Sequence, residues 1–209
     1  MKFFYRLLAG AGVLLALLII VSFFIPSNVH VERSLLMNAP RANIYSQVNN
    51  LENWTNWMPW NRKDPAMQIE FNEGPKEGKG ATYMWKSEHS EVGNGTMRIT
   101  ESTPDSIATE MTMAGMGSST AYYKFKDTPD GVMVTWGFDS DGKGTPWYMV
   151  VPSKYFSFFM DDMLGSEFEK GLAALEVAAS HSTLPGPEAT PVNDQQLDTN
   201  IRDQHNIQE

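Results

Sequence analysis

The sequence VERSLLMNAPRANIYSQVNNLENWTNWMPW, residues 31–60, contains the pattern that decides the fold. It continues an alternation over residues 28–36 that has the two-residue period of a β-strand. Asn38 and Pro40 then predict the start of a helix, with Asn38 as its cap and Pro40 in its first turn. One apolar face of this helix consists of Ile44, Val48 and Leu51. The stretch therefore predicts a strand followed directly by two short helices.

Three tryptophans stand within seven positions of the same stretch, at Trp54, Trp57 and Trp60. Such large rings are costly to leave in water, so a ligand, a membrane, a partner or the protein's own core must receive them. Trp54 and Trp57 continue the helical spacing of the preceding apolar face, which favours a structural role at one end of the sheet. Pro59 interrupts the stretch and fixes a turn. Trp60 is the ring that we expect to reach a ligand.

Six strand-like runs follow, separated by turn residues such as Gly-Pro and Pro-Asp-Gly. They comprise residues 67–72, 80–87, 94–101, 107–113, 120–126 and 132–139. Residues 153–179 then form one long predicted helix. Its apolar stripe consists of Phe156, Met160, Met163, Leu164, Phe168, Leu172 and Leu175. This order predicts an α+β fold, in which a curved antiparallel sheet of about seven strands surrounds a long C-terminal helix.

Composition excludes several classes of function. The chain has 209 residues and a formal net charge of −9, and its basic residues do not gather on one face, so we expect no nucleic-acid partner. The absence of Cys excludes disulfides, thiolate nucleophiles and Cys-based metal sites. The four His have no partner at metal-ligand spacing. We therefore expect neither a metal nor any other cofactor.

An apolar segment at residues 7–25 has Ser22 as its only polar side chain. This length is what a helix needs to cross the hydrocarbon core of a bilayer. A cleaved signal peptide is the alternative, but the segment ends in bulky residues without a small-x-small cleavage site, which favours an uncleaved anchor. Lys2 and Arg6 precede the span, so the N-terminus is expected in the cytoplasm. In a bacterium, the sequence then predicts a single-pass protein of the inner (plasma) membrane whose domain faces the periplasm.

Three parts are expected along the chain. Residues 1–27 form the cytoplasmic N-terminus and the transmembrane anchor, and residues 28–180 form one folded domain. Residues 181–209 are rich in Pro, Asn, Gln and Asp and poor in apolar side chains. Such a segment buries too little apolar area to offset the entropy of ordering, so we expect a disordered acidic tail.

Several motifs resemble the SRPBCC superfamily, whose fold is called START-like or helix-grip. They are the V-x-R-S-x-x-x-N-A-P entry at residues 31–40, VNNLENWTNWMPW at 48–60, GKGATYMWK at 78–86, GNGTMRITE at 93–101 and MDDMLGSEFEKGLAAL at 160–175. The subgroup that they resemble most is the polyketide cyclase/dehydrase-like one. The resemblance implies a sheet that grips the C-terminal helix around a pocket for hydrophobic or amphipathic small molecules. Its members include lipid and hormone binders, cyclases, hydroxylases and protein-binding stress factors, so the fold does not choose the function.

Alternation assigns one face of each strand to the interior, and this face is rich in methionine and aromatic residues. Such side chains suit adaptable recognition of apolar ligands. The candidate ligand-binding residues are Trp60, Tyr83, Trp85, Met97, Ile99, Met111, Met113, Tyr123, Phe125, Trp136, Met160, Met163 and Glu167. The alternative is a filled core without a cavity.

Two carboxylates are candidates for chemistry. Glu101 follows Ile99 at strand spacing and is expected to point inward, and Glu167 lies within the apolar stripe of the long helix. A carboxylate facing a cavity would hold a polar ligand group or act as a general base. Alternatively, both reach solvent or pair with a Lys or Arg.

Three functions follow from these features. The leading hypothesis is a membrane-anchored START-like domain that binds a hydrophobic small molecule or lipid. A cyclase- or hydrolase-type enzyme using one of the two carboxylates is the first alternative, and a protein-interaction module of the cell envelope is the second. The oligomeric state is left open by the sequence.

The start of the long helix and the loop before it, residues 146–159, are apolar nearly all round. Trp147 lies in the loop, and Tyr155, Phe158 and Phe159 lie off the inward stripe of the helix. Such a helix end must meet something besides the sheet. We expect it to be either a lid over the pocket or a surface that docks onto the bilayer.

Overall fold

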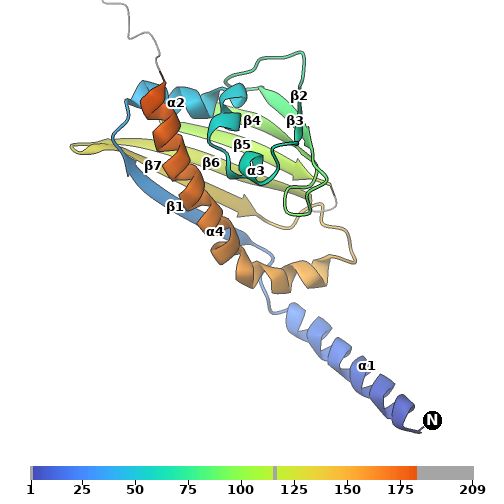
Figure 1. The fold of residues 1–209 in the computed structure, drawn as a ribbon. Coiled ribbons are helices and arrows are strands. Elements are labelled where there is room, and N and C mark those ends of the chain that lie inside the picture. The colour runs from blue at the N-terminus through green and yellow to red at the C-terminus, as the bar shows by residue number, and fades with distance from the viewer. Residues whose placement is uncertain (1, 115–116, 183–209) are drawn as a thin grey trace, which may run out of the picture.

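The computed structural model describes residues 2–114 and 117–182. A seven-stranded antiparallel sheet with the order β1-β7-β6-β5-β4-β3-β2 curves around one long helix, α4 (Figure 1). The strands are β1 (Val29–Met37), β2 (Gln68–Phe71), β3 (Thr82–Lys86), β4 (Gly95–Thr103), β5 (Ser106–Met113), β6 (Gly117–Thr128) and β7 (Gly131–Ser140). The predicted α+β helix-grip class is confirmed.

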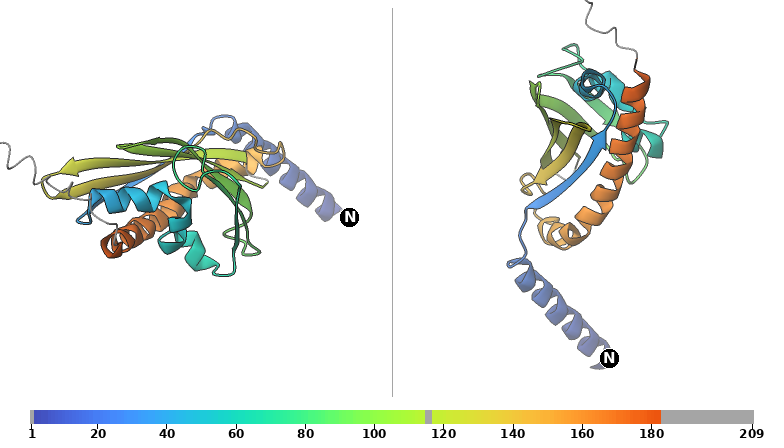
Figure 2. Two further views of the ribbon diagram at one scale, coloured as in Figure 1. Left: turned by 90° about the horizontal axis from the view of Figure 1, so that it is seen from above. Right: turned by 90° about the vertical axis from the view of Figure 1, so that its left-hand side faces the viewer.

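The helices of the domain lie on one face of the sheet, while α1 extends away from it (Figure 2). They are α1 (Lys2–Ser22), α2 (Arg41–Asn49), the 3-10 helix η1 (Leu51–Asn56), α3 (Pro59–Lys63) and α4 (Val150–His181). Three short helices follow the first strand where two were expected, because Pro59 begins a new helix at its first position. The predicted disordered tail lies outside the described residues from position 183 onward.

The predicted strands all form, with ends that differ from the expected ones by up to three residues at each end. The largest difference is in β6, which begins at Gly117 rather than at 120 and ends at Thr128 rather than at 126. The two additional residues at its end join β7 through the pair Thr128–Gly131. Turn residues thus mark the connections correctly, but the pairing of strands extends further into them than alternation indicates.

Trp54 and Trp57 are core residues, as predicted. They are 2% and 0% exposed, respectively. The indole nitrogen of Trp54 donates to the carbonyl of Val48 at 2.8 Å, and that of Trp57 donates to the carbonyl of Gln47 at 3.1 Å. These bonds hold both rings against the end of α2, so the tryptophans close one end of the sheet.

Two glycines of α4 allow the helix to approach the sheet closely. A Cβ on Gly171 would lie 2.5 Å from Cζ3 of Trp136, whose ring stacks on Phe168 at 4.1 Å between centroids. At Gly165 the guanidinium of Arg33 occupies the space that a side chain would need. One face of the C-terminal half of α4 is buried in consequence, with buried residues from Gly165 to Ala179.

Arg33 fastens α4 to the edge strand β1. Its Nη1 and Nη2 donate to the two carboxylate oxygens of Asp161 at 3.0 and 3.1 Å, and its Nε donates to Glu169 at 3.0 Å. Paired donors that match a carboxylate in this way give the most directional of ion pairs. Arg33 therefore fixes the position of α4 along the direction of β1.

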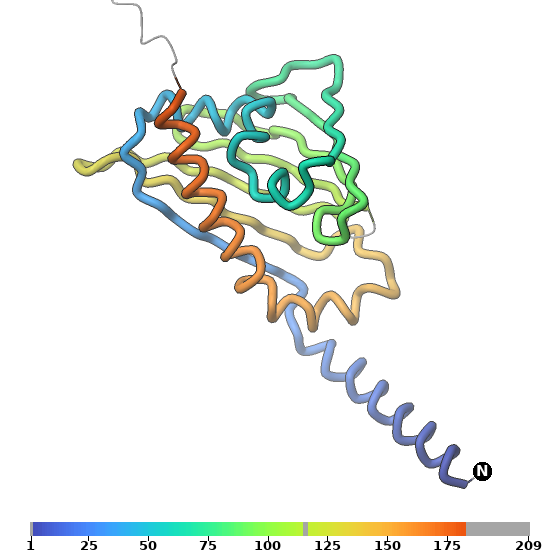
Figure 3. Tube along the Cα trace, viewed as in Figure 1, coloured from blue at the N-terminus to red at the C-terminus, as the bar shows by residue number. Residues whose placement is uncertain are grey.

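The first half of α4 departs from the predicted apolar stripe. Phe156 and Met163 were expected to face inward, but they are 48% and 52% exposed. A helix of 32 residues is about 48 Å long, whereas a nine-residue strand such as β1 spans only about 30 Å. The first turns of α4 therefore extend beyond the end of the sheet (Figure 3). The stripe is correct only where the helix has a sheet beneath it.

Gly171→Ala should destabilise the domain because the new methyl group meets Trp136 in a filled core. Overpacking of this kind costs about 1–3 kcal/mol, offset by about 1 kcal/mol of helix propensity. Gly12→Ala is the control, since no atom lies within 4 Å of its added Cβ. Thermal unfolding of the full chain in detergent, followed by circular dichroism, should give a lower midpoint for the first variant alone.

The ion pair between Arg33 and Asp161 should make stability depend on pH. Arg33 lowers the pKa of Asp161, chiefly through the hydrogen bond. A carboxyl with a depressed folded pKa stabilises the protein above its unfolded pKa of about 3.9 and loses this contribution as the pH falls through the folded value. The difference in unfolding free energy between the wild type and Asp161→Asn should thus be constant from pH 7 to about 5 and shrink below about 4.

Urea unfolding of the full chain at several pH values measures this difference. Asp162→Asn removes the neighbouring carboxylate, which makes no contact with Arg33, and serves as the control. A gap for Asp161→Asn that stays constant down to pH 3 would contradict the assignment.

Candidate functional site

The structure brings most of the predicted ligand-binding residues together on the concave face of the sheet. Those that are buried are Tyr83, Trp85, Met97, Ile99, Tyr123, Phe125 and Trp136. Trp60, Met111, Met113 and Met160 are half-buried and pack against this core. Met163 is exposed, because it lies on the overhanging half of α4.

An aromatic cluster fills the part of this interior next to α4. The ring of Trp57 lies 5.9 Å from that of Tyr123 and 5.7 Å from that of Trp136, and Trp136 stacks on Phe168. Edge-to-face and stacked contacts at these distances are favourable beyond the area that they bury. At this end of the grip, the protein's own rings occupy the interior.

One polar group within the cluster is fully buried without a hydrogen-bond partner among the described residues, and it is the indole nitrogen of Trp136. Burial raises the pKa of the nearby phenols of Tyr83 and Tyr123. The rings of both phenols contact Trp54, at 6.2 and 5.9 Å between centroids, so the two lie on the same side of the core.

The other buried indoles of the domain are satisfied, which makes the unpaired indole of Trp136 distinctive. The indole nitrogens of Trp54 and Trp57 donate to backbone carbonyls, and that of Trp85 donates to the carbonyl of Val92 at 3.4 Å. Buried polar groups are nearly always paired, and an unpaired one costs about 1–3 kcal/mol. An oxygen atom of a ligand placed at this indole would accept a hydrogen bond from it.

Sequence reasoning missed two members of this site. Trp54 contacts both Tyr83 and Tyr123, and Phe168 supports Trp136 from α4. Phe168 was visible in the helical stripe, but nothing in the sequence showed that it would stack on one particular ring. The unpaired state of Trp136 depends on its neighbours in space and leaves no trace in the sequence.

Half-buried methionines border the buried core on two elements. Met111 and Met113 project from β5, and Met160 projects with Leu164 from α4. All four pack against the core. Thioether side chains have several accessible rotamers and repack at low cost. The borders of the core are therefore apolar and deformable at these positions, whereas the aromatic cluster is closely packed.

The two candidate carboxylates do not share this interior. The expectation that Glu101 points inward was wrong: a β-bulge between Ile99 and Glu101 adds one residue to β4 and turns Glu101 to the outer, exposed face. Glu167 is largely buried, but its carboxylate lies 3.4 Å from Nζ of Lys63 and 3.0 Å from Nζ of Lys170. Glu167 therefore forms an ion-pair network at the margin of the sheet.

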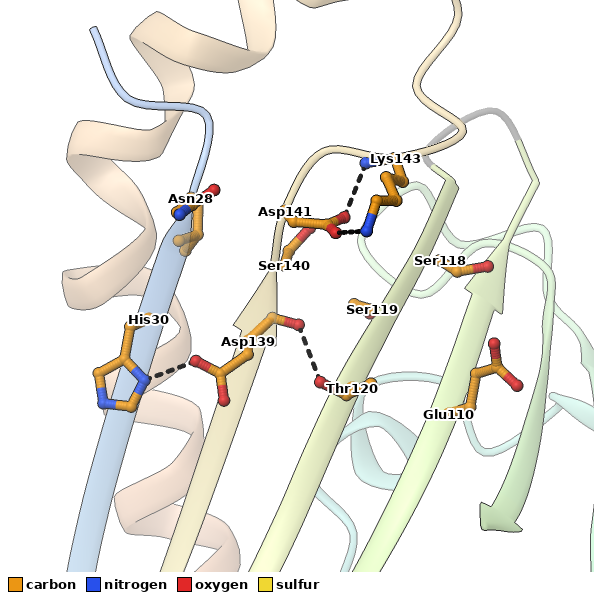
Figure 4. A pocket seen from close by; sticks show the side chains of 11 residues that line it. Asn28, His30, Glu110, Ser118, Ser119, Thr120, Asp139, Ser140, Asp141 and Lys143 are labelled. Atoms are coloured by element: carbon orange, nitrogen blue, oxygen red, sulfur yellow. Dashed lines mark hydrogen bonds and ion pairs between the residues drawn. The ribbon is translucent and has the colours of Figure 1, made fainter.

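Two hollows in the described residues lie outside this interior. One of about 520 Å³ lies at the end of the outer sheet face, where His30 pairs with Asp139 at 2.8 Å and Asp141 pairs with Lys143 at 2.6 Å (Figure 4). The other, of about 390 Å³, lies between Gln47 and His181. Neither is lined by a predicted ligand-binding residue. No group of three or more His, Cys, Asp or Glu in the described residues is placed to hold a metal ion.

Comparisons with known proteins agree on the fold. The family described as polyketide cyclase / dehydrase and lipid transport matches residues 28–179. No protein with a curated description matches the chain. A protein of unknown function from Staphylococcus aureus is similar in structure, with a TM-score of 0.54 and 12% identity over 73% of this chain and 93% of its own. An uncharacterised protein from Rhizobium leguminosarum has a TM-score of 0.51 and 15% identity over 74% of this chain and 96% of its own.

A third similar structure is that of StfQ, a di-domain ARO/CYC protein from the steffimycin biosynthetic pathway. It has a TM-score of 0.53 and 13% identity over 73% of this chain and 51% of its own. The chain therefore spans about half of StfQ. At these identities the likeness shows the fold alone.

Tyr123→Phe and Tyr83→Phe should change the stability of the ligand-free protein by less than about 0.5 kcal/mol. In the described residues neither hydroxyl forms a hydrogen bond, and each substitution keeps the ring that packs the core. Tyr45→Phe is the control, because its hydroxyl bonds the hydroxyl of Ser102 at 2.8 Å and its loss should destabilise. Urea unfolding of the delipidated chain measures all three, and a clear loss for Tyr83→Phe or Tyr123→Phe would show that these hydroxyls have partners after all.

Proposed function

The chain belongs to the polyketide cyclase/dehydrase and lipid transport family, and on that premise we propose that it binds a hydrophobic small molecule or lipid inside the grip. The apolar part of the ligand lies among the half-buried methionines of β5 and α4. Its polar end carries an oxygen that accepts hydrogen bonds from Trp136, Tyr83 and Tyr123. The residues of the chain bind and orient this molecule, and no bond is made or broken.

The observation that carries the proposal is the unpaired indole nitrogen of Trp136. It is fully buried, and the ring of Tyr123 lies 5.3 Å from that of Trp136. A core that only filled space would be expected to hold a Phe at position 136, because a buried donor without an acceptor destabilises the fold. A ligand oxygen supplies the missing acceptor. The indole that destabilises the empty protein is then the group that recognises the ligand.

The methionines provide the room that the ligand needs. Met111, Met113 and Met160 are half-buried and unbranched, so they change rotamer without moving the sheet. Trp60 stands beside them on α3, with its ring 6.0 Å from Trp136. These side chains lie at the deformable borders of the core. They form the proposed route from the surface to the polar groups.

We also propose that α1 anchors this binding domain in the bacterial inner membrane and that the domain faces the periplasm. In the described residues, α1 is the one helix long and apolar enough to cross a bilayer, a test that a signal sequence also passes. Lys2 and Arg6 flank its first turn and favour a cytoplasmic N-terminus. An envelope-facing domain tethered at residue 22 would meet apolar ligands at the membrane surface.

Native mass spectrometry of the full chain, purified from its own host in a mild detergent, tests the proposal. We expect a small molecule to be retained and to be extracted with organic solvent. Trp136→Phe keeps the ring stacked on Phe168 but removes the donor, so it should weaken retention by about tenfold, the value of one lost hydrogen bond.

Trp57→Phe is the matched control. It also removes a buried indole N–H, but this one already donates to the carbonyl of Gln47 within the protein, so retention should be unchanged. Retention that is equal in wild type and Trp136→Phe would contradict the proposed polar contact. If the wild type carries no small molecule at all, the filled interior favours the alternative of a protein-interaction module.

A further inference from the structure

A set of large apolar side chains at the start of α4 is exposed, and we call it the α4 face. It consists of Trp147, Tyr148, Val150, Phe158 and Phe159. Their exposed fractions range from 40% at Val150 to 87% at Trp147. Single exposed apolar residues are ordinary, but four exposed aromatic side chains within residues 147–159 mark a surface that meets something other than water. Val150, Phe158 and Phe159 belong to the half of α4 that extends beyond the sheet, and Trp147 and Tyr148 belong to the turn before it (Figure 3).

The α4 face is fastened to the end of α1. The hydroxyl of Tyr155 donates to the carbonyl of Leu18 at 2.7 Å, and Nζ of Lys154 donates to the carbonyl of Ser22 at 2.9 Å. Both side chains come from the first turns of α4, and Ser22 is buried at this junction. Since Leu18 lies four residues before the end of α1, the hydroxyl of Tyr155 contacts α1 about 6 Å before that end, measured along the helix axis. The start of α4 therefore lies beside the last turn of α1.

The length of α1 sets where this junction lies relative to a bilayer. The uncharged segment 7–25, of which α1 forms all but the last three residues, is about 28 Å long as a helix and matches a hydrocarbon core of about 30 Å. Phe23 and Phe24 follow directly and are 78% and 83% exposed. With α1 across the membrane, the end at Ser22 therefore lies at the boundary between the hydrocarbon and the headgroups. The first turns of α4 lie at the same level.

The charges around the α4 face suit this depth. From residue 144 to residue 160 the only ionisable group besides tyrosines is Lys154, and its ammonium is held by the C-terminal end of α1. The first acidic residues, Asp161 and Asp162, follow this segment, and Asp161 is engaged by Arg33. A face with aromatic rings, one lysine and no carboxylate has the composition of a segment that lies in the interface.

We propose that the α4 face docks onto the surface of the same bilayer that α1 spans, with lipid as its occupant. The proposal rests on the membrane anchoring proposed above and goes beyond it, because it fixes how the domain lies on the membrane. Docking places Met160 and Leu164, which continue α4 beyond the face, next to the lipid. The deformable border of the core at Met160 then opens toward the membrane, so that an apolar ligand passes between bilayer and grip without crossing water.

A single-cysteine label tests this arrangement, since the chain has no native Cys. Phe158→Cys places an environment-sensitive fluorophore in the α4 face of the full chain, reconstituted in vesicles of phosphatidylcholine and phosphatidylglycerol. We expect blue-shifted emission, quenching by doxyl-labelled lipid and protection from aqueous iodide. Adding Trp147→Ser and Phe159→Ser should reduce the lipid quenching.

Val177→Cys is the control, because Val177 is also an exposed residue of α4, at 59%, but lies about 28 Å further along the helix. Its label should be quenched by iodide and not by doxyl lipid. Iodide quenching at position 158 equal to that at 177 overturns the proposal. Protection from iodide without lipid quenching also overturns it, because a second copy or a closed lid then covers the face. Failure of the anchoring itself is distinct: the chain would not remain with the vesicles.

Discussion

The close approach of α4 to the sheet at Gly165 and Gly171 is the constraint on which the rest of the structure depends. Gly171 brings the helix backbone onto Trp136, and Gly165 leaves the space through which Arg33 reaches Asp161. These contacts fix both the distance of α4 from the sheet and its position along β1. Because α4 is longer than the strands, anchoring its second half leaves its first half beyond the sheet. The position of α4 thus determines both the packing of the aromatic cluster and the exposure of the apolar side chains at the start of the helix.

Three regions of the domain differ in what they can do. The aromatic cluster is closely packed, yet it contains one donor that the described residues leave unpaired. The half-buried methionines can change rotamer to admit a ligand, and the start of α4 lies against the end of α1. A ligand that enters from the membrane would therefore meet apolar, adaptable side chains first and polar groups last. This order suits an amphipathic molecule whose polar end enters the interior first.

Much of the fold could be predicted because its helices and strands follow from the spacing of apolar and turn residues within short segments. Alternation located the seven strands, and the spacing of Trp54 and Trp57 identified them as core. Three features depend on longer-range geometry and were missed. A one-residue bulge turned Glu101 to the outer face of the sheet. The greater length of α4 than of the strands left Met163 exposed. Only the residues around Trp136 in the folded protein show that its indole has no acceptor. The use of the predicted lining residues in ligand binding stays a prediction.

The indole proton of Trp136 tests the central claim most directly. In a ¹⁵N-labelled full chain, nuclear magnetic resonance separates the six tryptophan indoles, and Trp136→Phe assigns the signal. If a ligand oxygen accepts from Trp136, this proton resonates downfield in protein purified from its host and moves upfield on delipidation. The protons of Trp54 and Trp57, which bond backbone carbonyls, should stay in place. A Trp136 signal that is unchanged by delipidation would contradict the account.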